Sequence, residues 1–358
     1  MSVFKAPVRY FLGSMTPHGY VGTEHTLYDP QDGWYAYLLK GGAGTGKSTL
    51  LRHLYTAVGT EDPLAEVFCC SSDPSSLDAV RLPARKIAVL DATAPHVVEP
   101  QYWGAAEQPL PLFQCLDRRV LQPLLPALID LFREKRELFE KARQQLSAAA
   151  ALIADNRRIE QDNIDFGKID RLSRRLAQTE WDAETESGTC TVRFLSAVTP
   201  EGLLTFYDTV QALCPRIYVI EDEYGTSARY LLQRLQTAAL SDGKACITCP
   251  SPLFPQDGPE HLLLPASGVA FLTSNSLHKV DFPVYRRIHA SRFIDTAYIQ
   301  RKRHRLSFCR RAAADAIAEA VNLLEAASAV HRTIEAHYGT AMNWDIYHAL
   351  SDSLISAL

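Results

Sequence analysis

The segment that most constrains this chain is a glycine-rich run that ends in lysine and serine. Residues 41–48 read GGAGTGKS and match the phosphate-loop pattern GxxxxGK[ST] at every required position. An apolar strand candidate at 34–39 precedes the run, and a helical stretch at 49–57 follows it. Glycines allow successive backbone N–H groups to point at a polyphosphate, and the start of a helix adds a favourable dipole. The pattern therefore predicts an α/β chain with a nucleoside triphosphate site.

The same pattern assigns roles within the loop. Lys47 is expected to reach the β- and γ-phosphates, and the Ser48 hydroxyl to ligate Mg²⁺. We expect the nucleotide to be ATP. GTP stays open, because phosphate loops do not read the base. The predicted nucleotide-binding residues are Gly41, Gly42, Ala43, Gly44, Thr45, Gly46, Lys47, Ser48 and Thr49.

A second acidic element is expected at the end of a neighbouring strand. Residues 86–91 read KIAVLD, a short apolar run that ends in an acid. A buried parallel strand of this kind delivers its last side chain to the edge where open α/β sheets bind ligands. We predict that Asp91 holds Mg²⁺ through water, opposite Ser48. A strand-ending aspartate without a metal is the alternative.

The residue that would activate water is not evident. Ala92 follows Asp91, so no glutamate stands in the adjacent position. Hydrolysis then needs another group to orient the water, and the sequence offers Thr93, His96, Asp73 and Asp78. The predicted catalytic set is Lys47, Asp91 and His96, and the predicted metal ligands are Ser48 and Asp91. The absence of a glutamate after Asp91 predicts slow turnover, or transfer of phosphate to a group other than water.

The two halves of the chain resemble each other. Residues 8–19 recur as residues 192–202, and Gly44-Thr45 aligns with Gly225-Thr226 at an offset of 181. A collinear series of such matches indicates a duplication. We predict two tandem phosphate-loop-type α/β domains, each a mainly parallel sheet flanked by helices. The expected domains are 1–188, with a helical extension at about 110–182, and 189–358, with a helical C-terminal extension.

The second copy has lost the residues that hold phosphate. Ser227-Ala228-Arg229 replaces Gly46-Lys47-Ser48, and Asp222-Glu223 replaces Gly41-Gly42. Carboxylates there would repel phosphates, so we expect a degenerate domain that packs on or regulates the first. In the alternative interpretation, residues 217–223 form the acidic strand of a single ATPase with a long insertion.

Two features raise the question of further partners. The helical region at 110–182 is interpreted either as a packed subdomain or as a hairpin that contacts an unknown protein, and i,i+4 pairs such as Glu137 with Lys141 support the helix. Cationic residues in the second half are candidates to act on the bound nucleotide, although exposed arginines are ordinarily solvated. These candidates are Arg229, Arg286 and Arg287.

Composition excludes several classes of function. A formal net charge of −4 over 358 residues gives no reason to expect non-specific nucleic-acid binding. No apolar run is long enough to cross a bilayer, and the N-terminus lacks the apolar core of a signal peptide. Eight scattered cysteines then indicate reduced thiols and a cytoplasmic location. The CxxC at 246–249 is interpreted as core, with zinc or redox chemistry as the alternative.

Four segments together resemble a poorly characterised family of bacterial tandem P-loop ATPases. They are Tyr10–Gly13 with Thr16-Pro17, Leu39–Leu50, the CSSDPSSLD run at 70–78, and the LDATAPHVVEP run at 90–100. The resemblance spans essentially the whole chain and implies nucleotide binding and ATPase activity. In that family the second loop often carries its full pattern, and Ser227-Ala228-Arg229 departs from it.

The sequence thus predicts a slow Mg²⁺-dependent ATPase that acts as a nucleotide-dependent switch, with its site in the first half. A small-molecule or nucleotide kinase is the alternative, and a nucleotide-bound scaffold with negligible turnover is a third possibility.

Overall fold

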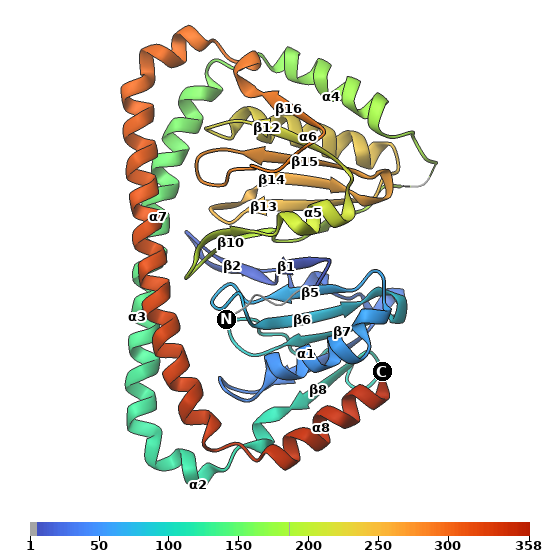
Figure 1. Ribbon diagram of the computed structural model, residues 1–358, viewed down its shortest axis with the longest axis vertical. Coiled ribbons are helices and arrows are strands. Elements are labelled where there is room, and N and C mark those ends of the chain that lie inside the picture. The colour runs from blue at the N-terminus through green and yellow to red at the C-terminus, as the bar shows by residue number, and fades with distance from the viewer. Residues whose placement is uncertain (1–5, 186) are drawn as a thin grey trace. The chain divides into compact units, whose positions relative to one another are not determined.

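The computed structural model describes residues 6–185 and 187–358, and it is an α/β structure (Figure 1). Within these residues the strands form two six-stranded mixed sheets, in which most neighbouring strands are parallel, and two small two-stranded ribbons. Helices flank each sheet, so the expectation of mainly parallel sheets covered by helices is confirmed.

Both sheets have the same strand order. The first consists of β1 (Arg9–Phe11), β5 (Glu66–Cys69), β6 (Leu77–Leu82), β7 (Ile87–Asp91), β4 (Tyr35–Lys40) and β8 (Glu107–Pro111). The second consists of β9 (Cys190–Val192), β13 (Cys246–Ser251), β14 (Phe254–Leu264), β15 (Val269–Ser274), β12 (Arg216–Glu221) and β16 (Arg286–His289). In each sheet the third strand, β6 or β14, is antiparallel to both neighbours. This match is what a duplicated chain would produce.

The remaining elements are ribbons and helices. The ribbons pair β2 (Gly13–Thr16) with β3 (Gly19–Gly22), and β10 (Ser196–Thr199) with β11 (Gly202–Thr205). The helices are α1 (Lys47–Ala57), α2 (Arg118–Leu121), α3 (Leu125–Gln161), α4 (Phe166–Glu180), α5 (Tyr207–Leu213), α6 (Thr226–Ser241), α7 (Thr296–Gly339) and α8 (Trp344–Ala357).

The chain divides into two compact units that are not consecutive in sequence. Unit 1 comprises residues up to 13, 22–142 and 321–358, and unit 2 comprises residues 14–21 and 143–320. The long helices α3 and α7 therefore have residues in both units. The predicted division into domains 1–188 and 189–358 describes the repeat in the sequence, and it stays a prediction.

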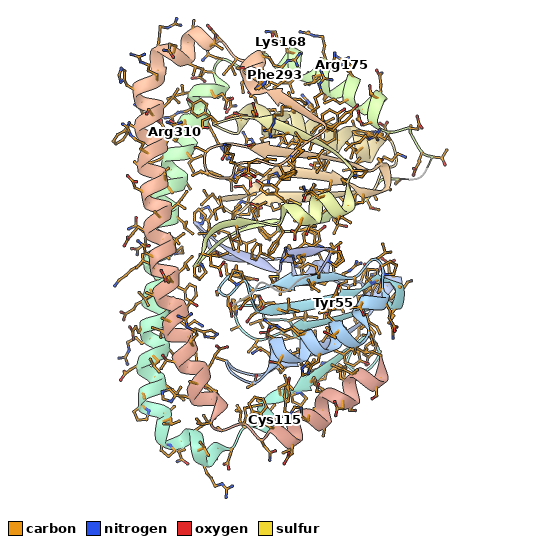
Figure 2. The ribbon with its side chains drawn as sticks, viewed as in Figure 1. Tyr55, Cys115, Lys168, Arg175, Phe293 and Arg310 are labelled. Atoms are coloured by element: carbon orange, nitrogen blue, oxygen red, sulfur yellow. The ribbon has the colours of Figure 1, made fainter. Side chains whose placement is uncertain are left out.

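The helix that ends each half of the sequence belongs to the unit formed mainly by the other half. Thus α4, at the end of the first half, belongs to unit 2, and α8, at the end of the second half, belongs to unit 1. In unit 2, α4 packs against α6, and Ile169, Leu172 and Leu176 of α4 join the core beneath the second sheet. Their spacing gives α4 one apolar face, and Asp165 caps its start by accepting a hydrogen bond from the Lys168 N–H. The buried Phe293 joins the same core (Figure 2). In unit 1, α8 from the end of the chain packs against α1.

Candidate functional site

The glycine-rich run forms a loop between β4 and α1 in unit 1. The strand and the helix lie where the sequence predicted them, and α1 begins at Lys47. Gly44 and Gly46 have φ angles of +71° and +80°, in the left-handed region that side chains disfavour. These two glycines are therefore required by the turn, and Gly46 lies directly before the first turn of the helix.

Lys47 is folded back over its own loop. Its Nζ donates hydrogen bonds to the carbonyl oxygens of Gly41, at 2.6 Å, and Gly42, at 2.8 Å. The same atom lies 3.6 Å from Oδ2 of Asp91. The Ser48 hydroxyl accepts a hydrogen bond from the Leu77 N–H at 2.9 Å. A phosphate in the loop would therefore compete with two carbonyls for the lysine.

Asp91 ends β7, and β7 pairs in parallel with β4 so that Asp91 lies opposite Leu39. This register places the carboxylate beside the loop that follows β4, as the strand pattern predicted. Burial raises the pKa of the Asp91 carboxyl, and the charge of Lys47 partly offsets that effect. The fold thus brings together Lys47 and Asp91, two of the three predicted catalytic residues.

His96 is held between two carboxylates. Its Nδ1 lies 2.9 Å from Oε1 of Glu24, and its Nε2 lies 3.2 Å from Oδ2 of Asp78. Burial lowers the pKa of His96, but Asp78, Cys70 and Glu24 outweigh burial and leave it far above its usual range. An imidazolium donates protons rather than accepting them, so His96 in this state cannot serve as a general base. Nothing in the sequence pattern pointed to Glu24.

The other candidates for orienting water are engaged elsewhere. Asp73 accepts hydrogen bonds from the hydroxyls of Ser75 and Ser76 within its own turn. The Thr93 hydroxyl donates to the Gly41 carbonyl at 2.9 Å, and Asp78 faces His96. These three side chains therefore hold the segments beside the glycine-rich loop, and each already has a partner other than water.

The C-terminal helices of unit 1 cover the outer side of the loop. A Cβ on Gly44 would lie only 2.6 Å from the Glu335 carbonyl oxygen of α7. A Cβ on Gly46 would lie 2.6 Å from the Tyr347 ring of α8, whose hydroxyl donates to the Gly46 carbonyl at 3.0 Å. Both glycines are thus needed for packing as well as for the turn. Sequence reasoning missed these contacts because they join residues from opposite ends of the chain.

Three ionisable side chains from α3 and α7 lie near the same loop. Lys135 Nζ is 2.9 Å from Nδ1 of His331, and His331 Nε2 is 3.6 Å from Oε1 of Glu335. Burial, with the charges of Lys135 and Lys47, lowers the pKa of His331 to about 4, so its Nδ1 accepts the lysine proton. Burial also raises the pKa of Glu335, against the opposing charges of Lys135 and Lys47. The loop therefore has a second lysine and a carboxyl group nearby.

In unit 2 the corresponding loop is filled by carboxylates. Asp222 Oδ2 accepts the Ala228 N–H at 2.7 Å, and Oδ1 accepts the Tyr224 N–H at 3.2 Å. Glu160 of α3 accepts the Thr226 N–H at 3.2 Å and the Ser227 hydroxyl at 2.9 Å. These donors stand at the start of α6, where a phosphate loop would present them to phosphate. The second loop thus binds the protein's own acids.

The two acids perturb each other. Burial, reinforced by the nearby charge of Asp222, raises the pKa of the Glu160 carboxyl to about 8. Burial likewise raises the pKa of Asp222, although the amides of Ala228, Gly225 and Tyr224 act against it. The raised pKa favours the protonated form of Glu160, which relieves the repulsion between the two carboxyl groups.

The acidic strand in the second half has the position of β4. β12 leads through the Asp222 loop into α6, just as β4 leads into α1. Its central place between β15 and β16 repeats the place of β4 between β7 and β8. This arrangement favours the repeat alignment over the interpretation of residues 217–223 as the acidic strand of one large ATPase.

Two of the three candidate arginines pair with acids of unit 2, and the third, Arg286, is exposed. Arg229 lies 3.3 Å from Asp257, and Arg287 lies 3.0 Å from Glu221. Cys246 and Cys249 of the CxxC are buried free thiols. The action of an arginine on the nucleotide stays a prediction.

Within the described residues, no helix combines the length and apolar character that crossing a membrane requires. Comparisons with protein-family models, with curated proteins and with solved structures found no match to this chain.

Proposed function

We propose that unit 1 binds Mg²⁺ and ATP in the loop of residues 41–48. The observation that carries this proposal is the juxtaposition of Lys47, at the first turn of α1, with Asp91 on the neighbouring strand. A lysine for phosphate and a carboxylate for hydrated Mg²⁺, at the end of parallel strands, are the parts that such a site needs. Lys135 supplies a further positive charge near the loop.

We infer slow hydrolysis, because the groups near the loop are poor activators of water. His96 is protonated, and Asp73 is bonded to the two serines of its own turn. Glu335 is the carboxyl group that remains, since its backbone lies against Gly44 and its side chain lies near His331. Burial raises the pKa of the Glu335 carboxyl, which favours proton uptake by its carboxylate.

The same contacts support a nucleotide-dependent switch. Phosphate would draw Lys47 away from the Gly41 and Gly42 carbonyls and reorganise the loop at Gly44, which touches the backbone of α7. A ligand shifts an equilibrium only by binding two states differently, and contact between loop and helix provides that difference. The proposed readout is a change in α7 and α8.

The test compares wild type with Lys47→Ala and with Lys302→Ala, an exposed lysine on α7 that serves as the control. Fluorescent ATP binding and phosphate release are measured with and without Mg²⁺. We expect binding and slow release in wild type and the control, and loss of both in Lys47→Ala.

Other outcomes would change the assignment. Binding by wild type without phosphate release would indicate a scaffold, and a phosphorylated acceptor would indicate a kinase. Equal ATP binding by Lys47→Ala and wild type would contradict the proposal.

A further inference from the structure

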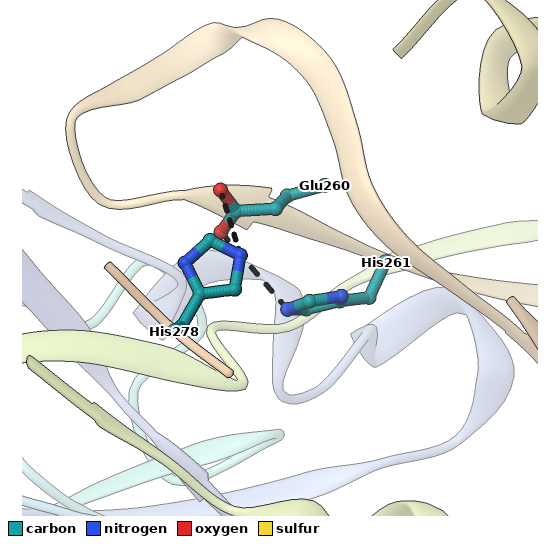
Figure 3. Close-up of side chains that lie close together, drawn as sticks. All are labelled: Glu260, His261 and His278. Atoms are coloured by element: carbon teal, nitrogen blue, oxygen red, sulfur yellow. Dashed lines mark ion pairs between the residues drawn. The ribbon is translucent and has the colours of Figure 1, made fainter. Parts of the chain in front are cut away.

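Unit 2 buries one carboxylate beside two imidazoles (Figure 3). Glu260 and His261 are consecutive residues of β14, and His278 follows β15. His278 Nε2 lies 3.6 Å from Oε1 of Glu260, and His261 Nε2 lies 4.0 Å from Oε2. One nitrogen or oxygen from each residue lies within 4.8 Å of the others. The three side chains thus converge on one small volume.

Two of the converging atoms have no hydrogen-bond partner among the described residues. Nε2 of His261 and Nε2 of His278 are both buried and unbonded. The side chain of His261 is 0% exposed and that of His278 is 5% exposed. Buried polar atoms in folded proteins are nearly always bonded to protein, water or an ion. Two unbonded nitrogens that face one carboxylate therefore indicate that a further atom belongs between them.

The residues of β6 that correspond to Glu260 and His261 have different side chains around them. Sheet register gives Ala79 and His261 the same place, because Ala79 pairs with Leu90 of β7 and His261 pairs with Leu272 of β15. The preceding residues, Asp78 and Glu260, then also correspond. In unit 1 the histidine beside Asp78 has Glu24 on its other nitrogen. Unit 2 has instead a second imidazole, His261, where unit 1 has alanine.

We propose that Glu260, His261 and His278 bind a divalent transition-metal ion, with zinc the preferred ion. Two imidazoles and one carboxylate are a donor set typical of zinc, whereas Mg²⁺ and Ca²⁺ prefer oxygen donors alone. Ligand atoms around a tetrahedral zinc, at about 2.0–2.1 Å from the ion, lie about 3.3–3.5 Å apart. Small side-chain movements convert the observed 3.6 Å and 4.0 Å separations into that geometry.

Two of the three proposed ligands face a cavity that can hold a fourth ligand. Glu260 and His278 line a cavity of unit 2, together with Arg157 and Arg310. A water in the cavity can complete the coordination. Arg157 does not oppose a cation with its full charge, because it lies 3.1 Å from Asp257.

One contact must change when the ion binds. The Thr273 N–H lies 3.2 Å from Nδ1 of His261, so in the neutral ring the proton is on Nε2, the atom that would ligate. Ligation through Nε2 moves the proton to Nδ1 and breaks this long hydrogen bond. A metal–nitrogen bond replaces it. The Glu260 backbone remains held by the Thr273 hydroxyl at 2.8 Å.

The experiment uses the full chain, stripped of metal and titrated with Zn²⁺ against a chromophoric chelator. We expect one zinc site per chain in wild type and a rise in unfolding temperature on zinc addition. Glu260→Gln and His278→Gln should each weaken binding by about 10-fold or more. His289→Gln is the matched control, since His289 is 68% exposed and pairs with Glu221 outside the cluster.

Cobalt substitution identifies the ligands. Co²⁺ should give a visible absorption spectrum of nitrogen and oxygen ligation, and a thiolate charge-transfer band would instead assign the ion to cysteines and overturn the proposal. The proposal would also be overturned if wild type bound no zinc in the titration, or if Glu260→Gln bound zinc as tightly as wild type. If His278→Gln fails to fold by circular dichroism, the isosteric Glu260→Gln decides. Lys47→Ala should bind zinc as tightly as wild type. The zinc titration therefore tests the metal site independently of the ATP proposal.

Discussion

The Tyr347 hydroxyl donates a hydrogen bond to the Gly46 carbonyl at 3.0 Å, although the two residues are 301 positions apart in the sequence. Tyr347 is almost fully buried, at 1% exposure, and its ring occupies the space that a side chain at position 46 would need. The last helix of the chain therefore supports the loop in which we propose that ATP binds.

Removing this hydroxyl should destabilise unit 1. Tyr347→Phe keeps the ring and leaves the Gly46 carbonyl without its donor, at a cost of about 1 kcal/mol in the free energy of unfolding. Denaturant titration followed by circular dichroism measures the change. Tyr102→Phe is the control, because the Tyr102 side chain is 54% exposed. Equal midpoints for the two variants would contradict a structural role for the contact.

Gly44→Ala should disrupt the loop by two separable effects. The positive φ angle of 71° strains any side chain, by about 1–3 kcal/mol, and the new Cβ would clash with the Glu335 carbonyl oxygen. Gly104→Ala isolates the first effect, since Gly104 also has a φ of 71° but has nothing within 4 Å of the place that the new methyl group would take. We expect Gly44→Ala to lose more stability than Gly104→Ala, and ATP binding to fall only in Gly44→Ala. Similar stability losses would show that α7 yields to the methyl group.

The Glu160 carboxyl predicts a pH dependence of stability in unit 2. Its pKa rises from an ordinary 4.5 to about 8 on folding, so the folded chain binds more protons than the unfolded chain between these values. Stability contributed by the neutral acid is present below about pH 4.5 and is lost as the pH rises to about 8.

Glu160→Gln should flatten this part of the profile. The amide cannot ionise, so no charge can develop at position 160 beside Asp222 as the pH rises. Urea midpoints between pH 5 and pH 9 measure the slope, and Glu137→Gln on the exposed surface of α3 is the control. A wild-type slope that persists unchanged in Glu160→Gln would assign the titration to another group.

Cys190 should be the most reactive thiol. A hydrogen bond from Cys246 lowers the pKa of Cys190 to about 5 despite partial burial, and Cys190 is the exposed cysteine. Its alkylation by iodoacetamide should increase through about pH 5 and level off above it, because the thiolate is the nucleophile. Mass spectrometry of the modified peptide gives the rate, and the buried Cys249 should stay unmodified. Cys246→Ala should move the midpoint upward, and an unmoved midpoint would exclude Cys246 as the donor.

Local sequence patterns are enough to predict the loop and its flanking elements. A positive φ angle selects glycine at Gly44 and Gly46, and this preference acts at each residue separately. The apolar runs of β4 and of β7, which ends at Asp91, likewise depend on a few neighbouring residues. The replacement of Gly41 by Asp222 in the second copy predicts a loop that does not hold phosphate, and this stays a prediction. No local pattern reveals that Asp222 bonds the amides of its own loop, with Glu160 from α3 beside it.

The sequence by itself determined where β4, β7 and the glycine loop between β4 and α1 lie, because turn geometry and short apolar runs depend on a few neighbouring residues. Tertiary structure alone decided that α4 packs in unit 2 and α8 in unit 1, that Glu24 and Asp78 enclose His96, and that Tyr347 meets Gly46. Those contacts join residues far apart in the chain, and burial and charge, which set the ionisation of His96 and Glu160, exist only once the chain has folded.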